Sequence, residues 1–83
     1  MDARGILLTE RHDLHNNKLV ALLEGETLTV IYRTHDGLVI KKKFNSDNLR
    51  EGLYRVAKIC GWMYALEYTS AQRIEFLNTG TMA

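Results

Sequence analysis

The chain has 83 residues, of which 46% are hydrophobic and 25% are charged. This is the composition of one small globular domain, which we place at residues 1–83, and its core is too small for the deep cleft of a multi-substrate enzyme. The 11 Lys and Arg residues against 10 Asp and Glu give a net charge of +1, so we expect no general attraction to nucleic acid or to an anionic membrane.

The first part of the chain predicts two strands joined by a polar loop. Residues 4–10 (RGILLTE) suit a short strand, and residues 11–17 suit a loop because His, Asp and Asn favour local turns. The apolar run at residues 18–25 fits either a buried strand or two helical turns, and we favour the strand. The run of four apolar residues near the N-terminus is too short for a signal peptide or a membrane span. We therefore expect a cytoplasmic protein with no membrane role.

Residues 27–44 predict a β-hairpin. Two β-rich runs, residues 27–34 and 38–44, are joined by His35-Asp36-Gly37, a three-residue loop in which the glycine takes positive φ. This loop predicts six cross-strand pairs: Arg33 with Val39, Tyr32 with Ile40, Ile31 with Lys41, Val30 with Lys42, Thr29 with Lys43, and Leu28 with Phe44. The register gathers apolar side chains on one face of the hairpin: Leu28, Val30, Tyr32, Leu38, Ile40 and Phe44.

A helix is predicted to follow the hairpin. It should start among residues 46–48, which are good N-cap residues, and Asn48 and Glu51 have the spacing of a capping box. We expect Gly61 to end the helix in a left-handed cap, and Gly52 in its interior to cost about 1 kcal/mol relative to alanine. The apolar stripe predicted to cover the hairpin comprises Leu49, Leu53, Val56, Ala57 and Cys60.

Residues 62–80 allow two interpretations. Their alternation favours a second hairpin that turns near residues 70–72, and the competing interpretation is a second helix capped at Ser70 and ending near Gly80. We prefer the hairpin and expect Trp62 and Tyr64 to complete the core. The order β-β-β-β-α-β-β then predicts an α+β fold, a single two-layer domain with an antiparallel sheet and one main helix on one face. Since the chain has no proline to protect a strand edge, the sequence also allows a homodimer formed by strand addition.

The lysine run at residues 41–43 could form a nucleic-acid-binding patch. Because neighbouring side chains in a strand point to opposite faces, Lys41 and Lys43 share a face with Arg33, and Lys42 points to the helix side. The competing interpretation is a solvated sheet face that blocks edge pairing, and Tyr32 on the core face cannot stack on bases. Nucleic-acid binding through Arg33, Lys41 and Lys43 is therefore the alternative function.

The sequence predicts no catalytic, metal or cofactor site. His12, Asp13 and His15 lack a third and fourth zinc ligand at a recognisable spacing, and Cys60 suits the core better than the role of a nucleophile. A single cysteine also excludes an intrachain disulfide and fits a reducing compartment. The chain has no phosphate-binding glycine loop, Gly-x-Ser-x-Gly or His-Glu-x-x-His motif. We expect that this protein is not an enzyme.

The predicted outer face of the helix carries residue types that are common in protein interfaces. Tyr54 lies there with Arg50, Arg55 and Lys58, and Tyr and Arg are frequent energetic anchors of such interfaces. We therefore expect a small non-catalytic protein-binding module: an adaptor, a subunit or a stoichiometric inhibitor, of a kind that phages and mobile elements also encode. It would act through this outer helix face and a sheet edge.

Overall fold

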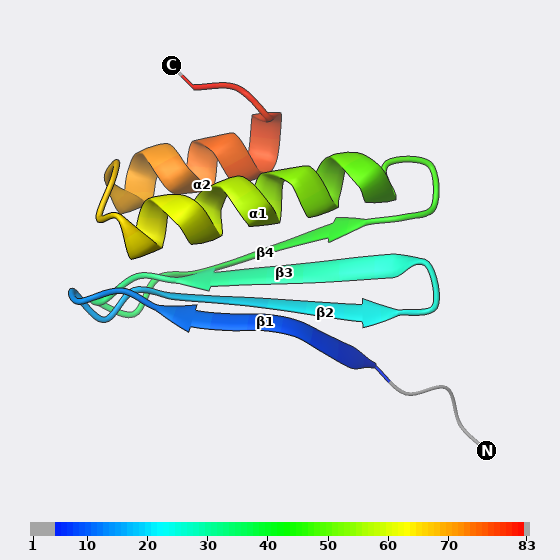
Figure 1. The fold of residues 1–83 in the computed structure, drawn as a ribbon, viewed down its shortest axis with the longest axis horizontal. Helices are drawn as coiled ribbons and strands as arrows, with labels where there is room; N and C mark the ends of the chain where they lie inside the picture. The colour runs from blue at the N-terminus through cyan, green and yellow to red at the C-terminus, as the bar shows by residue number, and fades with distance from the viewer. Residues whose placement is uncertain (1–4, 83) are drawn as a thin grey trace.

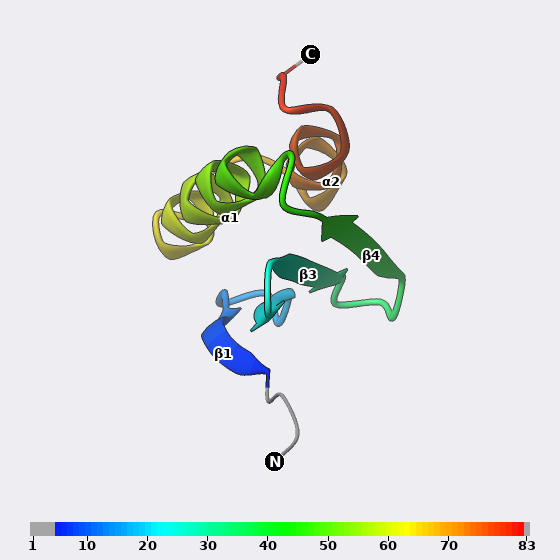
Figure 2. The same cartoon turned by 90° about the vertical axis from the view of Figure 1, so that its right-hand side faces the viewer.

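Four antiparallel strands and two helices build the fold. The structure, a computed structural model, describes residues 5–82. The sheet has the strand order β1 (Ile6–His12), β2 (Lys18–Glu24), β3 (Thr27–Arg33) and β4 (Val39–Phe44), and the helices are α1 (Leu49–Tyr64) and α2 (Ser70–Thr79). Both helices lie on the same side of the sheet (Figure 1, Figure 2). The predicted α+β class is confirmed, with two helices in place of one.

The β3–β4 hairpin has the predicted register. All six predicted pairs are present, from Arg33 with Val39 to Leu28 with Phe44. The Thr34 N–H donates to the Leu38 carbonyl at 2.9 Å, and Gly37 takes a left-handed φ of 98°, as the three-residue loop requires. Leu38 alone departs from the prediction, since it lies in the loop before β4 and is exposed.

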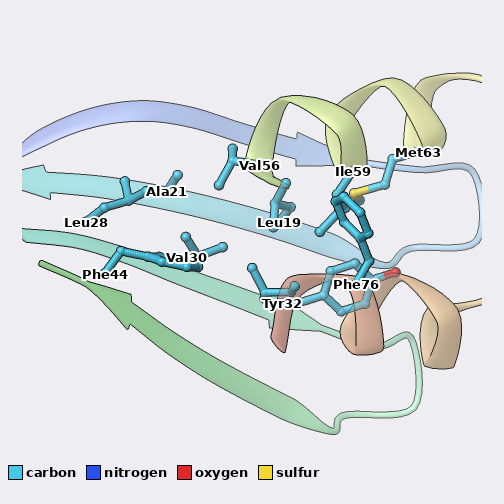
Figure 3. Close-up of a cluster of buried hydrophobic side chains, with 11 residues drawn as sticks. Leu19, Ala21, Leu28, Val30, Tyr32, Phe44, Val56, Ile59, Met63 and Phe76 are labelled. Atoms are coloured by element: carbon cyan, nitrogen blue, oxygen red, sulfur yellow. The ribbon is translucent and has the colours of Figure 1, made fainter. Parts of the chain in front are cut away.

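The hydrophobic core lies between the sheet and the two helices (Figure 3). The interpretation of residues 18–25 as a strand is confirmed, because β2 sends alternate apolar side chains into this core. Fully burying a large apolar side chain contributes about 1.5–3 kcal/mol. The buried hydrophobic residues are Leu19, Ala21, Leu28, Val30, Tyr32 and Phe44 from the sheet, Val56, Ile59 and Met63 from α1, and Phe76 and Leu77 from α2.

The buried face of α1 is rotated relative to the predicted stripe. Leu53 and Ala57 are exposed, which corrects the prediction for both. The close approach at Gly52 explains the rotation, because a Cβ atom there would lie 2.5 Å from Cγ of Phe44. Gly52 therefore lets the helix pack closely on β4. The sequence predicted only its cost to the stability of the helix, and not this role in packing. The buried residues of α1 are Gly52, Val56, Ile59 and Met63.

The start of α1 lies where it was predicted, but the capping box does not form. Asn48 is the N-cap residue and makes no side-chain cap hydrogen bond to the helix. Its Oδ1 accepts instead from the Asn45 N–H at 2.8 Å, and Glu51 pairs with Arg55 at 3.0 Å. The Asn48 side chain is thus used in the turn at residues 45–48, and the Glu51 side chain is used in an i, i+4 ion pair, so neither is free to form the capping box.

The hairpin predicted after the first helix is wrong, and the competing second helix is present as α2. The first helix continues through Gly61, which forms no left-handed cap, and ends at Tyr64. The N-cap of α2 is Thr69, whose hydroxyl accepts from the Gln72 N–H at 3.2 Å, while the Gln72 side chain accepts from the Thr69 N–H at 2.9 Å. This capping box outweighs the alternating pattern. Gly80 caps the other end with a φ of 79°.

Candidate functional site at the loop end of the sheet

Three connections meet at one end of the molecule (Figure 1). They are the β1–β2 loop (residues 13–17), the β3–β4 loop (residues 34–38) and the α1–α2 connection (residues 65–69). Side chains from all three line one hollow of about 480 Å³. We call this region the loop end. Since loops held on a rigid scaffold often carry function, the loop end is a candidate functional site.

A buried ion pair joins these connections. Nη1 of Arg73, in α2, donates to Oδ2 of Asp13 at 2.7 Å, and the two side chains are only 3% and 0% exposed. The same nitrogen donates to the Tyr32 hydroxyl at 2.9 Å, and Nε donates to the Glu67 carbonyl at 3.0 Å. The Tyr32 hydroxyl also lies 3.0 Å from Oγ of Ser70. A buried charge is tolerated when it is paired and hydrogen-bonded in this way.

Asp13 organises the loop to which it belongs. Its Oδ1 accepts from the N–H groups of His15 at 2.9 Å and Asn17 at 3.0 Å, and its Oδ2 accepts from the Asn17 amide at 2.9 Å. Oδ1 of Asn17 accepts from the His35 N–H at 2.8 Å and so reaches the β3–β4 loop. Burial would raise the pKa of Asp13, but the hydrogen bonds from Arg73 and Asn17 outweigh burial and lower this pKa to about 2. The carboxylate is therefore ionised and holds the three connections together.

The α1–α2 connection has an unfavourable backbone conformation. Leu66 and Tyr68 take left-handed φ values of 57° and 66°, which cost a residue with a Cβ atom about 1–2 kcal/mol. Packing and hydrogen bonds hold the connection in place. The Trp62 ring meets the rings of Tyr68 and Phe76 edge-on, with 4.7 Å between centroids in each pair, and the Glu67 N–H donates to the Trp62 carbonyl at 2.7 Å. Strain of this kind is concentrated at functional sites in proteins.

Large apolar side chains are exposed at the loop end. The exposed fraction is 86% for Leu14, 81% for Tyr64, 47% for Tyr68 and 43% for Leu66. Tyr64 was expected in the core, and it is exposed because it is the last residue of α1, whereas Trp62 packs against the core as expected. We call Leu14, Tyr64, Leu66 and Tyr68 the loop-end surface. A cluster of this kind on a small domain is typical of a contact surface.

Two hollows border the loop-end surface and have Leu66 and Asp13 in common. The hollow of about 480 Å³ is flanked by His15 and His35. A second hollow, of about 640 Å³, is lined by residues of β1, the β1–β2 loop and the end of α1: Arg11, His12, Asp13, Leu14, Met63, Tyr64 and Leu66. Both hollows are open and shallow, which suits the side chains of another protein better than an enclosed small molecule.

Arg11 lines the second hollow and has one buried donor without a partner among residues 5–82. Among the described residues, its Nε is buried and has no hydrogen-bond partner, and its guanidinium carbon lies 6.0 Å from the centre of the Tyr64 ring. A buried N–H without an acceptor costs about 1–3 kcal/mol.

The residues predicted to bind a partner lie on α1, and the structure brings only some of them together. Tyr54, Arg50 and Lys58 are exposed, and Nζ of Lys58 lies 6.0 Å from the centre of the Tyr54 ring. The Tyr54 ring also packs on Phe76 at 6.2 Å between centroids. Tyr54 is 51% exposed, and no residue of α1 has a positive φ, in contrast to the α1–α2 connection.

Arg55, the fourth predicted contact residue, lies in the groove between the helices. Its Nη1 donates to the Leu77 carbonyl at 3.0 Å, its Nε donates to Glu51 at 3.0 Å, and its guanidinium carbon lies 5.4 Å from the centre of the Phe44 ring. The side chain is largely buried by these contacts. Arg55 therefore holds α2 against α1, and little of it remains for a partner.

The residues of the alternative nucleic-acid site share the helix-free face of the sheet. Arg33, Lys41 and Lys43 point to this face, and Lys18 of β2 joins them there. Lys42 points to the helix side, where its Nζ lies 5.7 Å from the Phe44 ring centre. Every Trp, Tyr and Phe side chain in the chain belongs to a helix, to the α1–α2 connection or to the core face of the sheet. The patch consequently lacks a stacking platform for bases.

The structure offers little for metal or thiol chemistry. Within residues 5–82, no group of three His, Cys, Asp or Glu side chains is arranged to hold a metal ion. Asp13, between His12 and His15, binds Arg73 instead. Cys60 is half-buried against the core, and its Sγ lies 3.8 Å from Oγ1 of Thr9.

Comparison of this chain with protein-family models, curated proteins and solved structures gives no match. Neither helix within residues 5–82 has the length and apolar character that a membrane crossing requires.

Proposed function

We propose that this chain is a small protein-binding module, an adaptor, subunit or stoichiometric inhibitor, that contacts its partner through the loop-end surface. The observation that carries the proposal is the combination of exposed apolar side chains with a buried network beneath them. The Arg73–Asp13 pair fixes the connections that bear Leu14, Leu66 and Tyr68. A surface that is already ordered loses little conformational entropy on binding, and tyrosines are frequent interface anchors. The proposed role is binding and not catalysis.

The partner that fits this surface is a protein segment with apolar side chains and an acidic group. The apolar side chains would enter the two hollows beside Leu66. The acidic group would pair with the positively charged side chain of Arg11, which lines the second hollow. We place the module in the cytoplasm because its cysteine, Cys60, is free and half-buried, which suits a reducing compartment.

Affinity capture with paired variants tests the proposal. Tyr64→Ala removes a loop-end anchor, and Leu66→Asn removes an apolar side chain but keeps a residue that tolerates left-handed φ. Tyr54→Ala, on the outer face of α1, is the matched control. We expect a protein captured by the natural chain to be lost with the Tyr64 and Leu66 variants and retained with Tyr54→Ala. Isothermal titration with that protein should show about a fivefold or larger loss of affinity for Tyr64→Ala.

The opposite pattern would contradict the assignment of the surface. If Tyr54→Ala abolishes capture while both loop-end variants bind normally, the partner uses the outer face of α1. If nuclease treatment removes every captured protein, the interaction with proteins is indirect and the proposed function is wrong.

Nucleic-acid binding is a second candidate function, favoured by one observation. Arg33, Lys41 and Lys43 lie together on the helix-free face, and Lys18, which also lies there, is paired with Glu10 at 3.0 Å. The double variant Lys41→Glu, Lys43→Glu should abolish binding to an oligonucleotide, and the binding of the natural chain should fall steeply with salt. Oligonucleotide binding that this variant leaves unchanged would remove the candidate.

A further inference from the structure

Within residues 5–82, no helix or loop covers the face of the sheet opposite the helices (Figure 2). Side chains on this open face form rows across the four strands, because residues directly opposite each other in neighbouring strands share a face. The middle row consists of Glu10, Val20, Ile31 and Lys41. The row on one side of it consists of Leu7, Leu22, Thr29 and Lys43, and the row nearest the loop end consists of His12, Lys18, Arg33 and Val39.

Two copies of the middle row are complementary when they run in opposite directions. Its two ends carry opposite charges, Glu10 on the edge strand β1 and Lys41 on the edge strand β4, and its centre is apolar. A half-turn about an axis parallel to the strands lays β1 of one copy over β4 of a second copy. Each Glu10 then faces a Lys41, and each Val20 faces an Ile31. A half-turn about an axis across the strands would instead set Glu10 against Glu10, which is unfavourable.

The open face also has an apolar depression that a second sheet can fill. A hollow of about 240 Å³ is lined by Val20, Ile31 and Val39, with Lys18 and Arg33 at its rim. Two sheets that pack face to face lie about 10 Å apart with interdigitated side chains. The apolar side chains of a second copy would therefore occupy this depression and exclude water from both faces.

The row nearest the loop end limits the strength of such a contact. It would set Lys18 opposite Arg33 of the second copy, and these charges repel. The repulsion is reduced because Glu10 already pairs with Lys18 at 3.0 Å, and both long side chains can extend to solvent at the end of the sheet. The contact would involve only four strands of six or seven residues each, a small face beside the roughly 800 Å² per partner of a typical stable complex. The charges and the area together indicate weak, reversible association.

We propose that two copies of this chain associate through their open faces as a face-to-face sandwich, with the two-fold axis parallel to the strands. This inference does not rest on the protein-binding function, because the contact is made by the strands and not by the loop-end surface. It differs from the strand-addition homodimer that the sequence allows, since no strand is added to a sheet edge.

Sedimentation equilibrium from about 10 µM to about 1 mM measures this association. We expect a monomer–dimer equilibrium for the natural chain. Ile31→Lys places a charge at the centre of the contact and should raise the dimer dissociation constant about tenfold or more. Leu53→Lys, an equal change at an exposed position of α1, is the matched control and should leave the equilibrium unchanged.

A charge exchange tests the orientation of the two copies. Glu10→Lys and Lys41→Glu should each weaken the dimer, and the double variant should bind more tightly than either single variant because it restores opposite charges in the row. Circular dichroism confirms that each variant is folded. A natural chain that stays monomeric at about 1 mM would overturn the proposal, as would an Ile31→Lys variant that dimerises normally. A double variant no tighter than the single variants would also overturn it.

Discussion

Breaking the buried ion pair tests whether it stabilises the loop end. Arg73→Met removes the guanidinium and leaves the Asp13 carboxylate, which is fully buried, with only the donors of its own loop. Removing one partner of a buried pair costs about 3–5 kcal/mol. A domain of this length has a total free energy of unfolding of about 4–12 kcal/mol. We therefore expect this variant to lose a large part of its stability.

The pH dependence of the natural chain gives a second measure of the same interaction. The pKa of Asp13 is lowered from 3.8 to about 2 in the folded chain. This difference corresponds to about 2 kcal/mol of stability. Because the folded-state pKa is the lower one, the contribution is fully present above the unfolded pKa and is lost as the pH falls through about 2. The free energy of unfolding that depends on Asp13 should therefore fall most steeply between pH 3.8 and about 2.

Urea unfolding, followed by Trp62 fluorescence at several pH values, measures both effects. Asp13→Asn should abolish the part of the acid-dependent loss that belongs to this carboxyl group. Glu51→Gln is the matched control, because it breaks the exposed pair with Arg55 and should cost no more than about 1 kcal/mol. An Arg73→Met variant whose free energy of unfolding stays within about 1 kcal/mol of the natural chain would contradict the stabilising role of the pair, as would an Asp13→Asn variant that keeps the full acid-dependent loss.

Two further predictions concern the backbone of α1 and of the connection that follows it. Gly52→Ala should lower the free energy of unfolding by about 1–3 kcal/mol because of the contact with Phe44, whereas Gly61→Ala, which meets nothing within 4 Å, should raise it by about 0.5–1 kcal/mol. Equal urea midpoints for the two variants would contradict the close approach. Leu66→Gly should be more stable than Leu66→Ala by about 1 kcal/mol, since both remove the side chain and only alanine keeps a Cβ atom at a φ of 57°. A more stable alanine variant would show that the left-handed conformation carries no strain.

Local information was sufficient to predict the β3–β4 hairpin. The loop of His35, Asp36 and Gly37 sets the register, and the two-residue period of a strand then decides which side chains face the core. The face of α1 was missed because it depends on the contact between Gly52 and Phe44. A glycine gives no apolar signal in a helical pattern, so a stripe drawn from apolar residues alone is displaced toward Leu53.

The second helix and the loop end were missed for different reasons. The capping box of Thr69 and Gln72 is visible in the sequence, but the alternation from Trp62 to Tyr68 is the longer pattern and favours strands. The pair of Asp13 with Arg73 joins residues 60 positions apart, which no local pattern reveals. Had residues 70–79 been assigned as a helix, Arg73 would have fallen on the same face as Leu77, and a charged residue on an apolar face indicates a buried partner.

The two proposed surfaces would act together. The loop-end surface is built by the connections and the open face by the strands, and His12 borders both. A half-turn about an axis parallel to the strands does not change positions along the strands. The loop ends of both copies would therefore lie at the same end of the dimer, which would present two loop-end surfaces side by side. A partner with two equivalent sites could then engage both, and its second contact would be intramolecular. Such a partner would also stabilise the dimer by linkage, because it binds the paired state more tightly than two separate chains. Weak self-association would therefore be sufficient for a dimer to form on such a partner, since binding of the partner would supply the rest of the free energy of dimerisation.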